Sequence, residues 1–159
     1  VNRAIGALRL RNDLLVGLLA GTRTSRGDEV ASQAALSIRF LARSSSKFDL
    51  SSTTDALISA LDVPSDTVRI PTCHSLSWLA PAAASPALVR VVEEGDDASV
   101  DLRVHALIAL GNIHRGSGMV EPAVLKAVEG AMASNEVEII EAASLALGMM
   151  GIQPAVFRE

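Results

Sequence analysis

The 159-residue sequence predicts an all-α protein, an α-solenoid of stacked antiparallel helix pairs that winds into a right-handed superhelix. Three observations predict this fold class. A short phrase recurs along the chain, apolar residues repeat at helical spacing, and the composition is 49% hydrophobic but only 3% aromatic. A core of Ala, Leu, Val and Ile suits close helix–helix packing better than an aromatic-rich sheet does.

The recurring phrase opens the first helix of each predicted pair. It reads Pro-Ala-Leu-Val-Arg-Val-Val at 86–92 and Pro-Ala-Val-Leu-Lys-Ala-Val at 122–128, and Pro-Ala-Val-Phe-Arg begins it again at 154. Proline fits the first turn of a helix because the N–H that it lacks would have no partner there. First helices are therefore predicted at roughly 11–20, 54–62, 86–94 and 121–133, with a fifth opening at 154.

A second phrase marks the other helix of each pair. Residues Ala106 to Gly111 read Ala-Leu-Ile-Ala-Leu-Gly, and 37 residues later Ala143 to Gly148 read Ala-Ser-Leu-Ala-Leu-Gly. Small residues let two helices approach to ~8 Å, and the glycines permit close contact or a left-handed exit. Second helices are predicted at roughly 29–42, 66–79, 99–113 and 136–150.

Several residues predict how these helices begin. Ser85 is the expected N-cap before Pro86, and acidic or amide caps are expected for the second helices at Asp28, Asp66, Asp97 and Asn135. Pro71 falls inside the helix at 66–79, so we expect a kink or a late helix start there.

These elements predict a single repeat domain over 1–159. Its repeats run roughly 11–43, 52–80, 85–115 and 121–151, with partial repeats at 1–10 and 152–159. Residues 1–10 read as the tail of a further second helix through Ala4, Ala7 and Leu8. We therefore expect the chain to be a fragment of a longer array.

The repeated residues resemble the HEAT repeat family, in particular its short bacterial-type repeats. In this family the second helix of a repeat reads Val-Arg, then Ala, then Ala-Leu-Gly and an aliphatic residue. The sequence matches this pattern almost completely at residues 102–113 and in part at residues 68–76. The copy at 139–148 has Ile140 in place of the Arg. The resemblance implies a solenoid, and it implies a ladder of Arg–Asp hydrogen bonds between repeats that only Arg69 and Arg103 could join. The proteasome/cyclosome repeat is the alternative type.

The formal net charge of −4 is divided unevenly. Residues 1–50 carry eight Lys or Arg and four Asp or Glu, a net of +4, whereas 51–159 carry six and fourteen, a net of −8. This asymmetry indicates either different partners at the two ends or ordinary solvated faces. No apolar run approaches the ~18 residues that cross a bilayer, no signal peptide is recognisable, and Cys73 is a single cysteine. These features favour a soluble, cytoplasmic protein without membrane contact.

The sequence offers no catalytic or metal-binding motif. His74, His105 and His114 have no carboxylate in a ligand spacing, so we expect no metal, no cofactor and no catalytic residue. Cys73 and His74 point about 100° apart on a helix, which favours a core thiol over a nucleophile and base. Arg26-Gly-Asp28 matches an adhesion tripeptide but also an ordinary turn before a helix. Arg115-Gly-Ser-Gly118 could bend around an anion but reads better as a helix exit loop.

One group of residues predicts a binding surface. With the second helices in register, one flank carries Leu36, His74, Ile108 and Leu145, followed one turn later by Phe40, Trp78, Asn112 and Met149. The flank is either a partner-binding groove centred on Trp78 or a packing surface between neighbouring repeats. The predicted partner-binding residues are Arg69, His74, Trp78, Arg103 and His105.

The sequence therefore predicts a non-enzymatic protein–protein interaction or scaffold module with a protein partner. The resemblance leaves two alternatives: a subunit of a phycobilin-lyase-like HEAT-repeat protein, and a HEAT-like nucleic-acid-binding protein. The second requires a basic groove, and only the first fifty residues are basic, which disfavours a nucleic-acid partner. Self-association through exposed solenoid ends is a further expectation.

Overall fold

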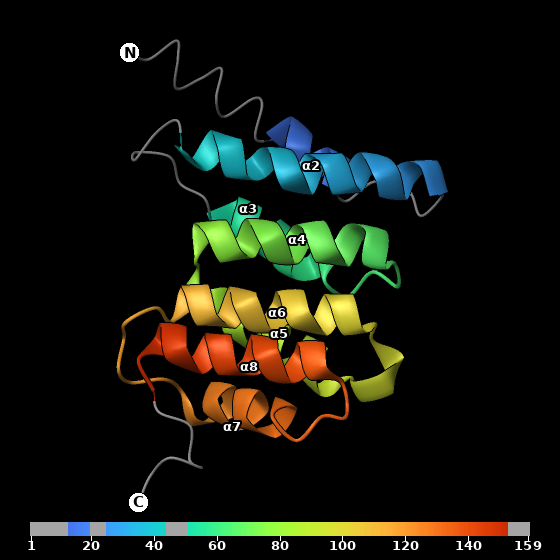
Figure 1. Ribbon diagram of the computed structural model, residues 1–159. Coiled ribbons are helices and arrows are strands. Elements are labelled where there is room, and N and C mark those ends of the chain that lie inside the picture. Colours follow the sequence, from blue (N-terminus) through green and yellow to red (C-terminus); the bar gives the residue numbers. More distant parts are fainter. Residues whose placement is uncertain (1–12, 20–24, 44–50, 153–159) are drawn as a thin grey trace, which may run out of the picture. The chain divides into compact units, whose positions relative to one another are not determined.

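The computed structural model describes residues 13–19, 25–43 and 51–152, and within those ranges it contains helices and turns but no strand (Figure 1). The helices occupy 13–19, α2 Ser25–Arg43, α3 Ser51–Ala60, α4 Asp66–Leu79, α5 Ser85–Glu93, α6 Val100–Ile113, α7 Pro122–Ala131 and α8 Val137–Met150. Two short 3-10 helices, Ala82–Ala84 and Gly95–Asp97, precede α5 and α6. The prediction of an all-α chain is confirmed. The expected helices at 1–10 and from 154 lie outside the described residues.

The predicted caps are mostly displaced by a few residues. Ser85 is the first residue of α5 rather than its cap, because the preceding 3-10 helix leads directly into α5 from Ala84. The cap of α6 is Ser99, whose hydroxyl accepts a hydrogen bond from the Leu102 N–H, while Asp97 ends the 3-10 helix.

The starts of three second helices also differ from the prediction. Asp28 lies within the first turn of α2, which begins at Ser25, and Asp66 is the first residue of α4. Glu136 replaces Asn135 as the cap of α8, and its side chain makes no capping hydrogen bond, so no capping box forms. Pro71 does not delay α4, which runs through it from Asp66.

The contacts group the chain into two compact units, Val1–Ser75 and Leu76–Glu159, and the boundary falls inside α4. In the first unit most buried side chains come from α2, α3 and α4, including Ile38, Leu57 and Cys73, and Leu19 of the helix at 13–19 is buried as well. The Ser75 hydroxyl donates a hydrogen bond to the Ala35 carbonyl, which joins α4 to α2. No helix in the described ranges is both long and apolar enough to span a membrane.

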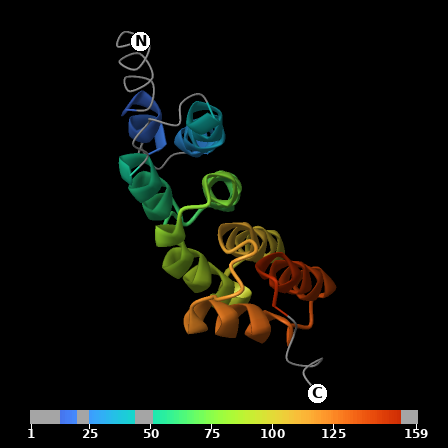
Figure 2. The ribbon, with the colours of Figure 1, turned by 90° about the vertical axis from the view of Figure 1, so that its left-hand side faces the viewer.

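The second unit contains two helix pairs, α5 with α6 and α7 with α8. Helix α6 packs against α8 and α5 against α7, so the four helices form two layers (Figure 2). The apolar residues that recur at helical spacing on α8 are all buried: Ile139, Ala143, Ala146, Leu147 and Met150. On α6 the corresponding residues Leu102, Ala106, Ala109 and Leu110 are buried and Ile113 is half-buried.

Gly111 sets the distance between α6 and α8. A Cβ at Gly111 would lie 2.9 Å from the Ala146 Cα and 2.9 Å from the Met149 sulfur. Real Cβ atoms do not approach backbone that closely, so the two helices can touch here only because residue 111 has no side chain. The predicted close approach is confirmed at Gly111 but not at Gly148, where a Cβ would meet no described atom within 4 Å.

The loop that follows α6 caps the end of α8. The N–H groups of Gly116 and Gly118 donate to the carbonyls of Met149 and Met150, at 2.9 and 3.3 Å. Both glycines have positive φ, +66° and +63°, which other residues adopt only at a cost. The left-handed exit of α8 itself is made by Gly151, with φ +76°, and not by Gly148.

The two equivalent glycines give a matched test of the close approach. Gly111→Ala forces a methyl group against backbone, so we expect it to lower the free energy of unfolding by about 1–3 kcal/mol. Gly148→Ala enters open space in an exposed helix interior, so it should raise that free energy by about 0.5–1 kcal/mol. Urea unfolding followed by circular dichroism measures both. Equal effects of the two substitutions would contradict the assigned contact.

Candidate partner-binding surface

The second unit exposes two large apolar side chains on the predicted flank. Trp78, near the C-terminal end of α4, is 59% exposed, and Leu145 on α8 is 51% exposed. Ile108, Asn112 and Met149 are half-buried. We call these five residues the Trp78 flank. Two members of the flank are therefore accessible and three are partly covered, and whether the flank binds a partner stays a prediction.

Polar contacts hold the middle of the Trp78 flank. The Asn112 amide donates a hydrogen bond to the Ser77 hydroxyl at 2.8 Å, and the Arg115 guanidinium donates to the Asn112 side-chain oxygen at 2.5 Å. Met149 lies beside Gly111, where its sulfur occupies space that a Cβ would need. Asn112 thereby joins the end of α6 to Ser77, the residue that precedes Trp78 in the chain.

Two predicted binding residues, Arg69 and His74, belong to the first unit. Arg69 is only 8% exposed, so little of its side chain is accessible to a partner. Its charge is close enough to lower the pKa of Cys73. His74 is half-buried, as are Leu36 and, in the second unit, His105. Phe40 is 57% exposed, and the Arg39 guanidinium carbon lies 4.8 Å from the centre of its ring.

Arg103 acts within its own helix pair. It is half-buried, and its Nε donates a hydrogen bond to the Val92 carbonyl of α5 at 3.3 Å. The resemblance to HEAT repeats implies an Asp partner for this arginine, but the bond that the structure gives it goes to backbone. Arg103 therefore ties α6 to α5, which limits what its guanidinium can offer a partner.

Cys73 is a core thiol, as expected. It is fully buried, and burial raises the pKa of the thiol to about 12, although the positive charge of Arg69 lowers it to a smaller extent. The thiolate is the reactive form of cysteine, so burial and the raised pKa disfavour reaction of Cys73 at neutral pH. No group of three or more potential metal ligands occurs among the described residues.

A contact between a serine and a histidine was not predicted from the sequence. The Ser85 Oγ lies 2.9 Å from the His114 Nε2 and joins the start of α5 to the end of α6. This is hydrogen-bond distance for a nucleophile and a base, but Ser85 is only 1% exposed, so a substrate carbon cannot reach its hydroxyl. The pair is a structural link. Because the two residues are 29 positions apart in the sequence, no local sequence pattern could predict their contact.

Two other short motifs prove to be structural. The backbone of 115–118 donates to the end of α8 through Gly116 and Gly118, so those N–H groups are not directed at an anion. This confirms the interpretation of an exit loop. Arg26-Gly-Asp28 lies in the first turn of α2, not in a turn before it.

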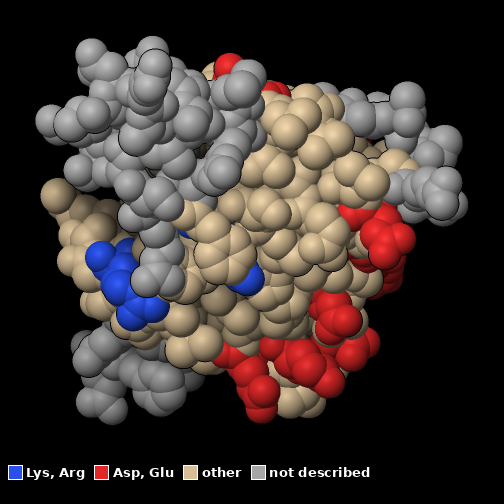
Figure 3. Space-filling view, turned by 90° about the horizontal axis from the view of Figure 1, so that it is seen from above, with Lys and Arg blue, Asp and Glu red and all other residues tan. Residues whose placement is uncertain are grey.

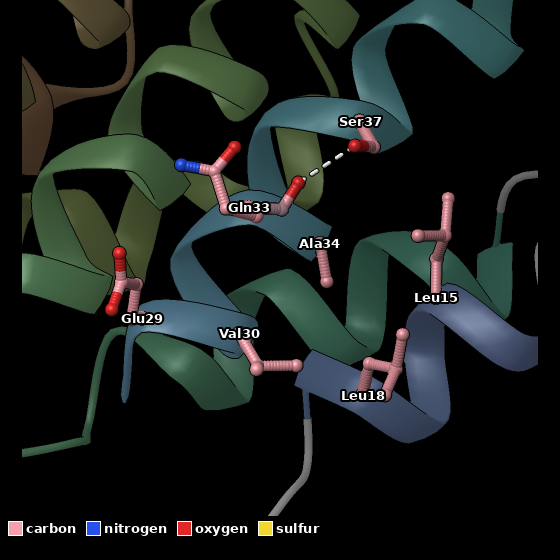
Figure 4. Close-up of a pocket in the computed structure, with 7 residues that line it drawn as sticks. All are labelled: Leu15, Leu18, Glu29, Val30, Gln33, Ala34 and Ser37. Atoms are coloured by element: carbon pink, nitrogen blue, oxygen red, sulfur yellow. Dashed lines mark hydrogen bonds between the residues drawn. The ribbon is translucent and has the colours of Figure 1, made fainter. Parts of the chain in front are cut away.

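An open apolar pocket in the first unit was not predicted from the sequence. The pocket has a volume of about 420 Å³ and lies between 13–19 and α2 (Figure 4). Leu15, Leu18, Val30 and Ala34 form apolar walls, and Ser37 donates a hydrogen bond to the Gln33 carbonyl behind them. Leu18 and Val30 remain about 40% exposed, at 38% and 41%.

Neither a comparison with models of known protein families nor one with curated proteins finds a match for this chain. The resemblance to HEAT repeats thus depends on the repeated residues alone and stays a prediction.

The pKa of Cys73 predicts both its reactivity and a pH effect on stability. Native protein at neutral pH should react with a thiol reagent at least about a hundredfold more slowly than protein unfolded in urea, because the thiol is buried and protonated.

The same thiol affects how stability depends on pH. The Cys73 thiol has its ordinary pKa of 9.0 in the unfolded chain, whereas its pKa in the folded protein is about 12. The contribution of Cys73 to stability is therefore complete below pH 9 and decreases as the pH rises toward 12. Fast modification of the native protein would contradict this burial.

Proposed function

We propose that the chain is a HEAT-like α-solenoid that acts as a non-enzymatic protein-interaction module and binds its partner through the Trp78 flank. The observation that supports this most is the exposure of Trp78, which directly follows Ser77, the residue that is hydrogen-bonded to Asn112. Tryptophan is frequently the residue that contributes most to binding at protein interfaces, because it buries a large area at low entropic cost. An indole that is 59% exposed leaves much apolar area for a partner to cover.

The charge of the second unit defines the chemistry of that partner. Residues 76–152 carry ten Asp or Glu and four Lys or Arg. Figure 3 shows acidic and basic side chains on the face of the chain that is seen from above. The net negative charge of residues 76–152 repels nucleic acid and favours a neutral or basic peptide that offers an apolar side chain to Trp78.

The proposal is tested with a library of displayed peptides selected on the whole chain. Trp78 is the one tryptophan of the sequence, so its fluorescence reports contact directly: a peptide that covers the indole shifts the emission to shorter wavelength. We expect Trp78→Ala to weaken the selected peptides by at least about tenfold. Met119→Ala is the control, because Met119 is a large apolar residue that is 88% exposed and lies outside the Trp78 flank, and it should leave the affinity unchanged. Peptides that bind Trp78→Ala as well as the unchanged protein would refute the proposal.

A further inference from the structure

Arg115 is an exposed cation that lies beside the Trp78 flank. Its guanidinium donates a hydrogen bond to the Asn112 side-chain oxygen at 2.5 Å. The next residue of the chain is Gly116, whose N–H donates to the Met149 carbonyl at 2.9 Å. Asn112 and Met149 are both members of the flank, so Arg115 is attached to the flank on two sides.

The guanidinium of Arg115 is held in place before any partner binds. The backbone N–H of Arg115 donates to the Asn112 carbonyl at 3.3 Å, and its side chain bonds the same residue. The Asn112 amide is itself fixed by its hydrogen bond to the Ser77 hydroxyl. A surface arginine ordinarily loses rotamer freedom when it binds, and this loss of entropy weakens binding. At Arg115 part of that freedom is already lost, so a group that pairs with it binds more strongly.

The charge of Arg115 is not neutralised by its own unit. Residues 76–152 carry ten Asp or Glu, yet no carboxylate of the described residues forms an ion pair with this guanidinium. The bond to Asn112 occupies one of the guanidinium nitrogens, and the N–H groups that remain form a planar fork. Such a fork matches the two oxygens of a carboxylate. A phosphate would fit the fork as well, but its higher charge is repelled more strongly by the acidic unit.

We propose that the peptide bound by the Trp78 flank carries an Asp or Glu whose side-chain carboxylate pairs with Arg115; this inference rests on the proposed function of the flank. Two hydrogen bonds and one peptide unit link the guanidinium to Trp78, through Asn112 and Ser77. The acidic residue therefore lies within about five residues of the apolar side chain that covers the indole. One carboxylate is compatible with a peptide whose net charge is neutral or basic. Trp78 then supplies affinity, and Arg115 determines which peptides bind.

The experiment uses peptides that are selected on the whole chain and that need Trp78 for binding. In each peptide the Asp and Glu residues are replaced one at a time by Asn and Gln, which keep the shape and remove the charge. Calorimetry measures the affinity of each peptide pair. One replacement should weaken binding to the unchanged chain by at least about fivefold, because it removes a charge-assisted hydrogen bond. The same replacement should have no effect on the affinity for Arg115→Gln.

Two further variants test whether the effect belongs to this position. Lys126→Gln removes the same charge from an exposed residue of α7 outside the flank, and the peptide should still need its carboxylate there. Arg115→Glu should instead prefer a peptide in which Lys replaces the acidic residue, because opposite charges then meet again. Circular dichroism checks that all variants are folded. If Lys126→Gln abolished the need for the carboxylate as Arg115→Gln does, the proposal would be overturned.

The source of the carboxylate is tested by converting the C-terminus of each peptide to an amide. Binding should be unchanged, and a loss of binding would assign the pairing group to the end of the peptide and overturn the proposal. Peptides that need Trp78 but no Asp or Glu would overturn this inference and leave the proposed function standing. If no selected peptide needs Trp78, the proposed function fails and this inference fails with it.

Discussion

The close approach of α6 and α8 at Gly111 is the constraint on which the second unit depends. Because residue 111 has no side chain, Ala146 reaches the backbone of α6, and the aliphatic rows on both helices are then sealed from water. Met149 lies beside Gly111 at this contact, and Asn112, the next residue of α6, donates a hydrogen bond to the Ser77 hydroxyl. Two members of the Trp78 flank therefore lie directly at the point where the missing Cβ lets the helices meet.

Polar links in this unit are individual hydrogen bonds between helices. Arg103 bonds a carbonyl of α5, Ser85 meets His114, and Asn112 meets Ser77. A core of small aliphatic side chains has few distinctive shapes, so sliding one helix along another costs little in packing alone. Hydrogen bonds with fixed partners remove that freedom, because a shifted helix would leave a buried polar group without a partner.

Much of the fold could be predicted because its elements are marked locally. Proline opens α5 and α7 near the expected positions, and small residues at helical spacing identify α6 and α8. Caps were misplaced where two candidates compete within three residues, as Asp97 and Ser99 do before α6. The site was harder to predict. Trp78 was identified by residue type, but the burial of Arg69 depends on the tertiary packing of its helix, and the contact of Ser85 with His114 joins residues far apart in sequence.

The loop after α6 has a consequence for how the second unit opens. Its glycine N–H groups complete the hydrogen bonding of the last turn of α8, so a fluctuation that frees the loop also exposes the end of a helix from the next pair. We therefore expect the loop and the last turn of α8 to open together in hydrogen exchange. Local opening of this loop is thereby coupled to the end of α8 through backbone hydrogen bonds alone.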